Sequence, residues 1–382
     1  MTKRLAILTH EYYPVLSGGS VFSDKISHEL SKLGWSVDIL TARVGRDLPK
    51  VEHDADVDIY RLDTARSSVM DSTLLEHLSY FGLGLPQMFS LAKSKRYDLL
   101  FSVFAIPSGL MALGLSRALG MPNVVFVDAS DTPGVESAMK TYVRYLGPLF
   151  RLVTHRAGGV VVLEGLEDLA LPHVENDAVE IIPNGAVIPA ETARPGENGP
   201  VLRLLSIGRL VLRKGFHSII EVLGQLARDG VPVALTIVGY GRAEEEIRKT
   251  LDACGATDRV TFVGRVEHAF LRDYYLSSDA YLFYGDREGS SLAMIEAAAY
   301  GLPVIASDHP GNRTYVEHGK SGFLVPHPDP KALGSAIRHL VEHRSELAAM
   351  GRASRAVAER YSWAAIAARY DAFFQRVMTK SR

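Results

Sequence analysis

Short apolar runs alternate along the whole chain with longer segments in which apolar residues recur at helical spacing. The short runs are rich in Val, Ile and Leu, which is typical of parallel strands buried on both faces. Strands are predicted at residues 5–9, 37–41, 58–62, 99–103, 124–127, 160–163, 203–207, 234–238, 260–263, 280–283 and 304–306. Helices are predicted at residues 21–33, 108–119, 137–156, 217–228, 243–253, 268–276 and 291–300.

This alternation predicts an α/β fold with two doubly wound, Rossmann-like domains. Residues 186–199 are rich in Pro and Gly and have no apolar period, so they are predicted to be a linker. We therefore expect a first domain over residues 1–185 and a second over residues 200–361. The aromatic tail, residues 362–382, predicts a helix that returns to the first domain.

Composition narrows the class of protein. The 382 residues are 47% hydrophobic and 23% charged with a net charge of −2, which excludes a disordered chain and disfavours a nucleic-acid binder. The single cysteine, Cys254, excludes an internal disulfide framework. The first apolar run is too short for a signal peptide, and no stretch is long enough to span a membrane. We expect a cytoplasmic protein, with peripheral attachment to the inner face of the membrane left open.

Glycines and cations follow the first strand of each predicted domain. Gly18-Gly19 precede a helix, where glycine lets the backbone approach a bound anion, although an ordinary βα turn explains the pair equally well. Arg209 and Lys214 lie in the loop after strand 203–207, and ligands of open α/β sheets sit at such strand ends. The two cations predict a diphosphate site, and the alternative is a solvated basic loop.

Two glutamates flank the start of the predicted helix 291–300. Glu288 lies in the loop after strand 280–283, and Ser290 or Ser291 is a suitable N-cap. Glu296 lies inside the helix among apolar residues, where a carboxylate needs hydrogen-bond donors. Two ribose hydroxyls would serve as donors, and the alternative is a core Arg or backbone N–H groups.

Aspartates occur at two further places. Asp54, Asp56 and Asp58 have the spacing of a metal triad, but a solvated turn is the favoured interpretation. Asp128 and Asp131 follow strand 124–127, where carboxylates can act on a hydroxyl acceptor. We assign Asp128 to the acceptor and Asp131 to loop geometry.

Two segments of the first half mix aromatic, apolar and basic residues. Residues 139–156 combine Tyr and Phe with basic positions, as interfacial membrane helices do, and Gly147-Pro148 would kink such a helix. Residues 74–96 run from aromatic and apolar residues into Lys93, Lys95 and Arg96. A helix with its basic edge in water is the alternative for the first segment.

The second half of the chain resembles the family-4 retaining glycosyltransferases of the GT-B fold, and the resemblance extends over nearly the whole chain. The matching stretches are Gly208-Arg209-Leu210, Lys214-Gly215, Glu288 to Glu296 in the family's E-x7-E spacing, residues 299–307 and residues 319–325. Weaker matches are residues 18–19, 183–185 and 238–241. The chain departs from the family at Asp128, where many relatives carry His, and at Ser290-Ser291, beside the donor sugar.

The resemblance implies two domains that face each other across a cleft, the first binding the acceptor and the second the donor. It implies that Arg209 and Lys214 hold the donor diphosphate, that Glu296 binds the ribose and that Glu288 contacts the sugar. It places the remaining donor contacts at Gly19, Arg265, Val266, Ser291 and Leu292. On the acceptor side, Asp131 matches the family better than Asp128 does. It implies no metal and no cofactor.

We therefore predict a retaining glycosyltransferase that moves a sugar from a nucleotide-diphosphate donor to a hydroxyl acceptor in glycan, glycolipid or polysaccharide biosynthesis. A lipid-linked acceptor at an anionic membrane surface would explain the two basic, aromatic segments. The alternatives are a nucleotide-sugar 2-epimerase of similar fold and a non-catalytic nucleotide-sugar-binding protein.

Overall fold

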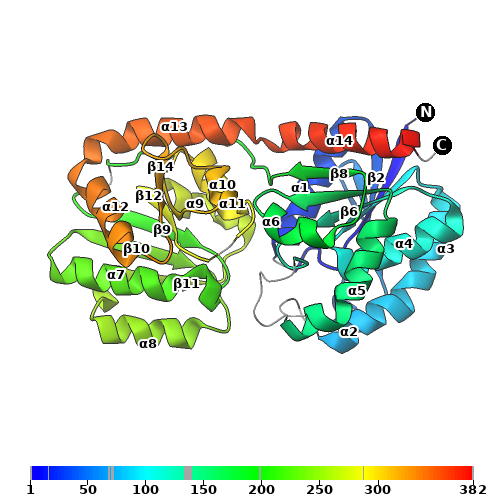
Figure 1. The fold of residues 1–382 in the computed structure, drawn as a ribbon, viewed down its shortest axis with the longest axis horizontal. Helices are drawn as coiled ribbons and strands as arrows, with labels where there is room; N and C mark the ends of the chain where they lie inside the picture. The colour runs from blue at the N-terminus through cyan, green and yellow to red at the C-terminus, as the bar shows by residue number, and fades with distance from the viewer. Residues whose placement is uncertain are drawn as a thin grey trace. The chain divides into compact units, whose positions relative to one another are not determined.

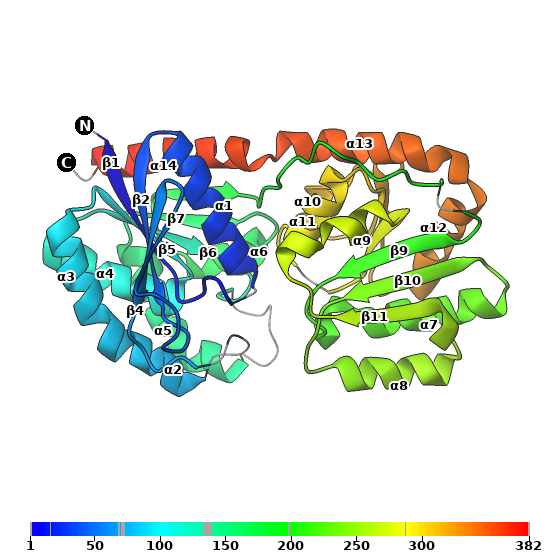
Figure 2. The same ribbon diagram turned by 180° about the vertical axis from the view of Figure 1, so that it is seen from behind.

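The computed structural model describes residues 2–15, 17–67, 69, 73–132, 140–197, 199–286 and 288–380. The chain forms two compact units. Unit 1 comprises Met1–Ile182 together with Trp363–Arg382, and unit 2 comprises Pro183–Ser362 (Figures 1 and 2). Each unit is an α/β body around its own sheet, as the alternation of strands and helices predicts.

The sheet of unit 1 has the strand order β3-β4-β2-β1-β5-β6-β7-β8, with β3 and β4 antiparallel. The strands are β1 (Lys3–Leu8), β2 (Trp35–Ala42), β3 (Val51–Asp54), β4 (Val57–Leu62), β5 (Leu99–Val103), β6 (Asn123–Val127), β7 (Gly159–Leu163) and β8 (Val179–Ile182). Strands β5, β6 and β7 are buried along their whole length, which explains their unbroken apolar sequence. The strand order reverses between β1 and β5, so the residues after these strands lie at a topological switch point.

Helices pack on both faces of this sheet. They are α1 (Gly18–Lys32), α2 (Leu74–Ser79), α3 (Leu85–Lys95), α4 (Leu110–Leu119), α5 (Lys140–Arg156), α6 (Glu167–Ala170) and α14 (Trp363–Lys380), with π turns η1 (Tyr80–Gly84) and η2 (Ala105–Gly109) and a 3₁₀ turn η4 (Leu171–His173). Helix α1 begins after Ser17, whose hydroxyl accepts the N–H of Ser20.

The C-terminal helix α14 belongs to unit 1. It contacts α1, β6 and β8 (Figure 1). Tyr370 and Phe374 pack on Phe101 with ring centroids 5.5 and 5.1 Å apart, and Trp35 Nε1 donates to Asp371 over 2.8 Å. The prediction of a helix returning to the first domain is confirmed, because its aromatic face completes that domain's core.

The sheet of unit 2 has the parallel order β11-β10-β9-β12-β13-β14. The strands are β9 (Leu202–Ile207), β10 (Val233–Val238), β11 (Val260–Gly264), β12 (Ala280–Phe283), β13 (Val304–Ser307) and β14 (Gly322–Val325). The order therefore reverses between β9 and β12, where doubly wound sheets bind ligands at the carboxyl ends of the strands.

Alternate residues of β9 face two different cores. Leu204 belongs to the cluster under α7 (Phe216–Arg228), α8 (Glu244–Cys254) and α12 (Pro330–Glu342), whereas Leu205 belongs to the cluster under α9 (Arg272–Leu276) and α10 (Leu292–Ala299). The other helices of unit 2 are α11 (Pro310–Arg313) and α13 (Leu347–Arg360), with the 3₁₀ turns η5 (Leu212–Lys214), η6 (Thr257–Arg259), η7 (His268–Phe270) and η8 (Arg344–Glu346).

The predicted linker, residues 186–199, requires a correction. Unit 2 already begins at Pro183, and Ala186 and Ala193 are buried in it. Their N–H groups donate to the carbonyls of Tyr361 and Tyr300 over 3.0 and 2.8 Å. The segment lacks a hydrophobic period because its described residues form an irregular stretch that packs on unit 2, not because it is a free linker.

Candidate functional site

The loops after β9 and β12 meet at the switch point of unit 2. Lys214 Nζ lies 2.7 Å from Glu288 Oε2, and Arg213 Nη1 lies 3.2 Å from the same oxygen. The Lys214 and Glu288 side chains are only 11% and 14% exposed. The structure thus brings together two residues that are 74 positions apart and that the family resemblance assigns to one donor site.

Gly215 makes this meeting of loops possible. It has φ +73°, and a Cβ atom there would lie 1.8 Å from the carbonyl oxygen of Tyr284. Any other residue would push the loop after β9 away from the loop after β12. The Lys-Gly pair in the sequence therefore combines a charged side chain with the backbone that lets it approach Glu288.

Burial and charge act on these groups together. Burial lowers the pKa of the Lys214 ammonium, and the Glu288 carboxylate opposes that shift. Burial raises the pKa of Glu288, but the charges of Lys214, Arg213 and Arg209 outweigh it, so the pKa lies below its usual range. Three cations and one carboxylate leave an excess of positive charge, which suits a bound polyanion.

Arg213 was not singled out from the sequence. It stands beside Lys214, but nothing in its spacing distinguishes it from a surface arginine. In the structure its side chain is 16% exposed and shares Glu288 with Lys214. Arg209, by contrast, is exposed and acts on the pair through its charge.

Glu296 lies in α10 with both carboxylate oxygens occupied. His268 Nε2 lies 2.6 Å from Oε1, and the Tyr275 hydroxyl donates to Oε2 over 2.9 Å. Among the described residues, the partners of Glu296 are thus a histidine and a tyrosine, and not the core arginine or backbone N–H groups expected as the alternative. His268 and Tyr275 are functional candidates that sequence reasoning missed, because neither lies in a recognisable motif.

The other residues of unit 2 that were predicted to contact the sugar donor follow strands β11 and β12 of the parallel sheet. Ser291 is the N-cap of α10, and its side chain makes no capping hydrogen bond. The first N–H groups of the helix, which begins at Leu292, have no partner within the helix. Arg265 and Val266 follow β11, and the Arg265 guanidinium lies 5.9 Å from the ring of Tyr240, which follows β10. All of these residues lie at the carboxyl edge of the sheet.

Gly19 of unit 1 packs against an aromatic ring. A Cβ atom at this position would lie 2.5 Å from Phe104 Cζ and 3.7 Å from Glu11 Oε2. Phe104 follows β5 and has φ +76°, an unusual conformation for a bulky residue. The glycine is thus required for close packing at the β1/β5 switch point, and its predicted contact with a diphosphate stays a prediction.

Asp128 and Asp131 both organise loops. Asp131 accepts the N–H groups of Ala105 and Ile106 over 2.7 and 3.5 Å, whereas Asp128 Oδ1 accepts the N–H and the hydroxyl of Ser130 over 2.7 and 2.6 Å. Burial raises the pKa of both carboxyls, and the charge of Asp128 raises that of Asp131 further. These bonds agree with a loop-ordering role for Asp131, and the acceptor role of Asp128 stays a prediction.

A buried histidine at the same edge was also missed. His10 follows β1, and burial lowers its pKa to about 4. Its ring lies 4.9 Å from that of Phe104 and 5.2 Å from that of His77, while Arg66 donates to its carbonyl over 2.6 Å. The sequence offers no signal for this cluster, because its members come from separate elements.

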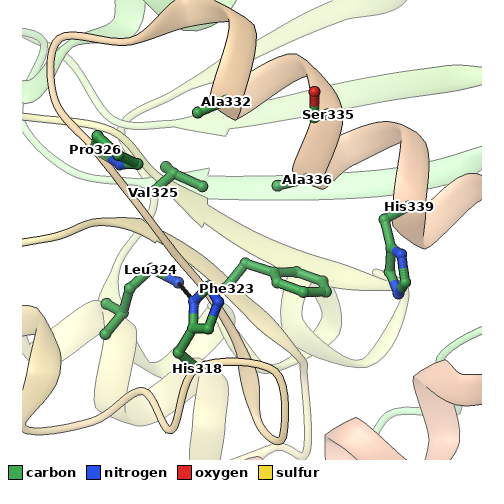
Figure 3. A pocket seen from close by; sticks show the side chains of 9 residues that line it. All are labelled: His318, Phe323, Leu324, Val325, Pro326, Ala332, Ser335, Ala336 and His339. Carbon is green, nitrogen blue, oxygen red and sulfur yellow. Dashed lines mark hydrogen bonds between the residues drawn. The ribbon is translucent and has the colours of Figure 1, made fainter.

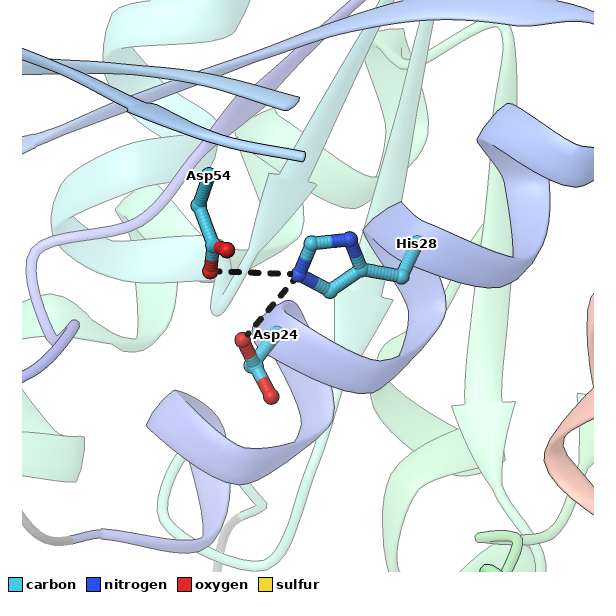
Figure 4. Close-up of side chains that lie close together, drawn as sticks. All are labelled: Asp24, His28 and Asp54. Carbon is cyan, nitrogen blue, oxygen red and sulfur yellow. Dashed lines mark ion pairs between the residues drawn. The ribbon is translucent and has the colours of Figure 1, made fainter. Parts of the chain in front are cut away.

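The aspartate triplet after residue 53 does not act as a unit. Asp54 ends β3 and Asp58 lies in β4, so a hairpin separates them. Asp54 instead lies with Asp24 and His28 (Figure 4), with His28 Nε2 3.4 and 3.6 Å from the two carboxylates. Lys25 pairs with Asp24 over 2.9 Å. The group is therefore interpreted as an ion-pair cluster that connects the β3–β4 hairpin to α1.

Unit 2 also carries a pocket away from the predicted residues. His318, Phe323 and His339 line it, between β14 and α12 (Figure 3). His318 Nδ1 accepts the N–H of Leu324 over 3.1 Å, so this ring nitrogen already has a hydrogen-bond partner.

No helix among the described residues has the combined length and apolarity that crossing a membrane requires.

Two family models match the chain in sequence. The model of the glycosyl transferase 4-like domain matches residues 17–185, and that of the glycosyl transferases group 1 matches residues 188–357. The chain therefore carries both domains of a glycosyl transferase, a 4-like domain followed by a group 1 domain. The expectation drawn from the Arg209–Lys214 loop and the E-x7-E spacing is thereby confirmed at the level of the family.

Known relatives agree with this family. The chain is 33% identical over 164 residues to the amylovoran biosynthesis glycosyltransferase of Erwinia amylovora, an alignment that covers 41% of the chain and 40% of the relative. It is 31% identical over 212 residues to a GDP-mannose-dependent phosphatidylinositol monomannoside mannosyltransferase of Mycobacterium tuberculosis, covering 53% of the chain and 54% of the relative. The chain thus spans about half the length of these relatives or less.

Solved structures share the fold of the glycosyl transferase. Sucrose-phosphate synthase of Thermosynechococcus elongatus matches with a TM-score of 0.85 at 20% identity, over 99% of this chain and 100% of that one. HepE of Anabaena, solved in complex with UDP and glucose, matches with a TM-score of 0.73 at 17% identity, over 98% of this chain and 100% of that one. The predicted GT-B architecture of two Rossmann-like domains is confirmed.

Proposed function

We propose that this glycosyl transferase moves a sugar from a nucleotide-diphosphate donor to a hydroxyl acceptor. The observation that carries the proposal is the buried cluster of Lys214, Arg213 and Glu288 at the β9/β12 switch point. Its excess positive charge suits a diphosphate, and its carboxylate suits sugar hydroxyls. Solved relatives in complex with UDP, and a relative that depends on GDP-mannose, support a nucleotide-sugar donor.

The chemistry follows from where charge develops. As the bond between the anomeric carbon and the phosphate oxygen breaks, negative charge collects on the leaving diphosphate. Lys214, Arg213, Arg209 and the first N–H groups of α10, which have no partner within the helix, would stabilise that charge. The acceptor hydroxyl forms the new bond to the anomeric carbon from the same face, and its proton passes to an oxygen of the leaving phosphate. The product would keep the anomeric configuration of the donor, and no metal takes part.

The acceptor would bind to unit 1, where Asp128 follows β6. Its Oδ1 is fixed by two hydrogen bonds from Ser130, so the carboxylate is held in one orientation. Asp131 connects the loop after β6 to the loop after β5, because it accepts the N–H of Ala105. An acceptor hydroxyl would therefore meet Asp128 rather than Asp131.

The acceptor would be lipid-linked and met at an anionic membrane surface. Apolar side chains along α2, η1 and α3 are exposed to between 38% and 76%: Leu75, Leu78, Leu83 and Phe89. Lys93 and Arg96 at the end of α3 are exposed as well, and each such cation near an anionic surface contributes about 1 kcal/mol. The described side chains of α5 add exposed Leu152, and those of residues 140–145 lie outside the described part.

Co-sedimentation with vesicles tests this surface. The double variant Leu75→Ser, Leu78→Ser should bind phosphatidylglycerol-containing vesicles less than the unmodified chain does. Val187→Ser, which changes an equally exposed side chain of unit 2, serves as the control. Binding that is equal with and without anionic lipid, or equal in both variants, would refute a membrane-bound acceptor and favour a soluble one.

Sugar transfer itself is tested with a panel of nucleotide sugars. We expect slow release of UDP or GDP from one donor in the absence of acceptor. With an acceptor present, the NMR spectrum of the glycoside formed should show that the anomeric configuration of the donor is retained. An isomerised sugar from donor alone would instead identify a 2-epimerase. Nucleotide binding without turnover under any acceptor would identify a non-catalytic binding protein.

A further inference from the structure

The carboxylate of Glu296 is fixed from two sides by groups that belong to different elements. His268 begins η7, in the loop after β11, and its Nε2 lies 2.6 Å from Oε1. Tyr275 lies in α9, and its hydroxyl donates to Oε2 over 2.9 Å. An ionised carboxylate only accepts hydrogen bonds, so both partners act as donors. The plane of the carboxylate is therefore set by two contacts, one on each oxygen.

Tyr275 is the rigid member of this pair. Its ring is 1% exposed and stacks on Tyr300 with centroids 4.9 Å apart and 14° between the planes. Burial, together with the charge of Glu296, raises the pKa of Tyr275 well above its usual range, so the hydroxyl keeps its proton. His268 is 31% exposed and is therefore the more accessible of the two donors.

The acceptor capacity that remains on Glu296 defines what it can bind. Each carboxylate oxygen offers about two lone-pair sites, and His268 and Tyr275 take one on each oxygen. Within the described part of the chain, one site is thus left on Oε1 and one on Oε2. Two hydroxyls on neighbouring carbons can fill both sites at once, because their spacing is close to that of the two oxygens of a carboxylate.

We propose that His268 and Tyr275 are positioning residues that make Glu296 a selective receptor for the vicinal diol of a ribose, so that the chain discriminates against 2′-deoxyribonucleotides. This inference rests on the proposed function, since it concerns the nucleotide of the donor. A 2′-deoxy nucleotide supplies one hydroxyl and leaves one carboxylate oxygen short of a donor. Hydrogen bonds to charged groups are strong enough to make its binding at least about tenfold weaker.

Titration with UDP, GDP, 2′-deoxy-UDP and 2′-deoxy-GDP measures this selectivity as a ratio of dissociation constants. We expect the ratio of deoxy to ribo to be about ten or more in the unmodified chain. It should fall toward one in His268→Ala and in Tyr275→Phe. His268→Gln should restore part of the selectivity, because its amide N–H can donate to the same oxygen.

A matched control is available in the same unit. His339 Nε2 lies 3.3 Å from Glu346 Oε2 and is 38% exposed, so His339→Ala removes a comparable histidine–carboxylate contact away from the site. It should leave the ratio unchanged. Equal ratios in the unmodified chain and in folded His268→Ala would refute the positioning role while UDP or GDP binding kept the proposed function. If the unmodified chain bound neither UDP nor GDP, the proposed function would fail, and this inference with it.

Discussion

Replacing Lys214 with Met removes one ammonium and keeps the length and apolar stem of the side chain. The Lys214 ammonium lies 5.2 Å from the centre of the Phe283 ring, and the thioether chain of methionine can pack on the same ring. Glu288 loses its 2.7 Å partner but keeps Arg213 at 3.2 Å, and no uncompensated carboxylate is left buried. We therefore expect unit 2 of Lys214→Met to stay folded.

The loss in binding follows from the charge that is removed. A hydrogen bond from an ammonium to phosphate contributes about 1.5–3 kcal/mol, which corresponds to roughly 10- to 150-fold in the dissociation constant of UDP or GDP. Uridine and guanosine carry no phosphate, so their weaker binding should not change. Calorimetric titration of all four ligands separates the two effects.

Lys249→Met provides the matched control. Lys249 pairs with Glu245 over 2.7 Å on the same unit, but its side chain is 73% exposed. Surface pairs of this kind contribute little, so this variant should bind all four ligands as the unmodified chain does. Unchanged diphosphate affinity in Lys214→Met, or an equal loss for diphosphates and nucleosides, would refute the placement of the diphosphate at the β9/β12 switch point.

Three further outcomes are expected. Burial keeps His10 neutral in the folded chain, whereas the unfolded chain protonates it below pH 6.5. As the pH falls from 6.5 toward 4, the free energy of unfolding, measured with urea, should therefore decrease by about 3 kcal/mol more than in His10→Phe. Parallel pH profiles of the two proteins would contradict this. Asp128→Asn should reduce transfer to acceptor but spare donor hydrolysis, whereas Asp131→Asn should lower the melting temperature; the reverse pattern would exchange the two roles. Removing divalent ions with EDTA should leave turnover unchanged, and loss of activity restored by added Mg²⁺ or Mn²⁺ would show that a metal takes part.

The buried strands were predictable because they are apolar along their whole length. β5, β6 and β7 could be read directly from the sequence. β3 was missed because its residues, Val-Glu-His-Asp, are half-buried or exposed, and β8 because it is a short edge strand buried only at its last residue. Edge strands are shaped by pairing with a neighbour more than by burial, so their sequences carry a weaker pattern.

The residues of the candidate site were predictable where they directly follow the ends of neighbouring strands. Lys214 and Glu288 follow strands that a doubly wound sheet brings side by side, so their meeting follows from topology alone. His268 and Tyr275 were missed because their contact with Glu296 depends on how the loop after β11 and helix α9 pack against α10. Such packing contacts leave no spacing rule in the sequence.

A crystal structure of the chain with bound UDP or GDP tests the central claim most directly. The account predicts the diphosphate within hydrogen-bond distance of Lys214 and Arg213, at the carboxyl ends of β9 and β12, with both ribose hydroxyls on Glu296. A nucleotide bound instead in the pocket between β14 and α12, or only on unit 1, would contradict it.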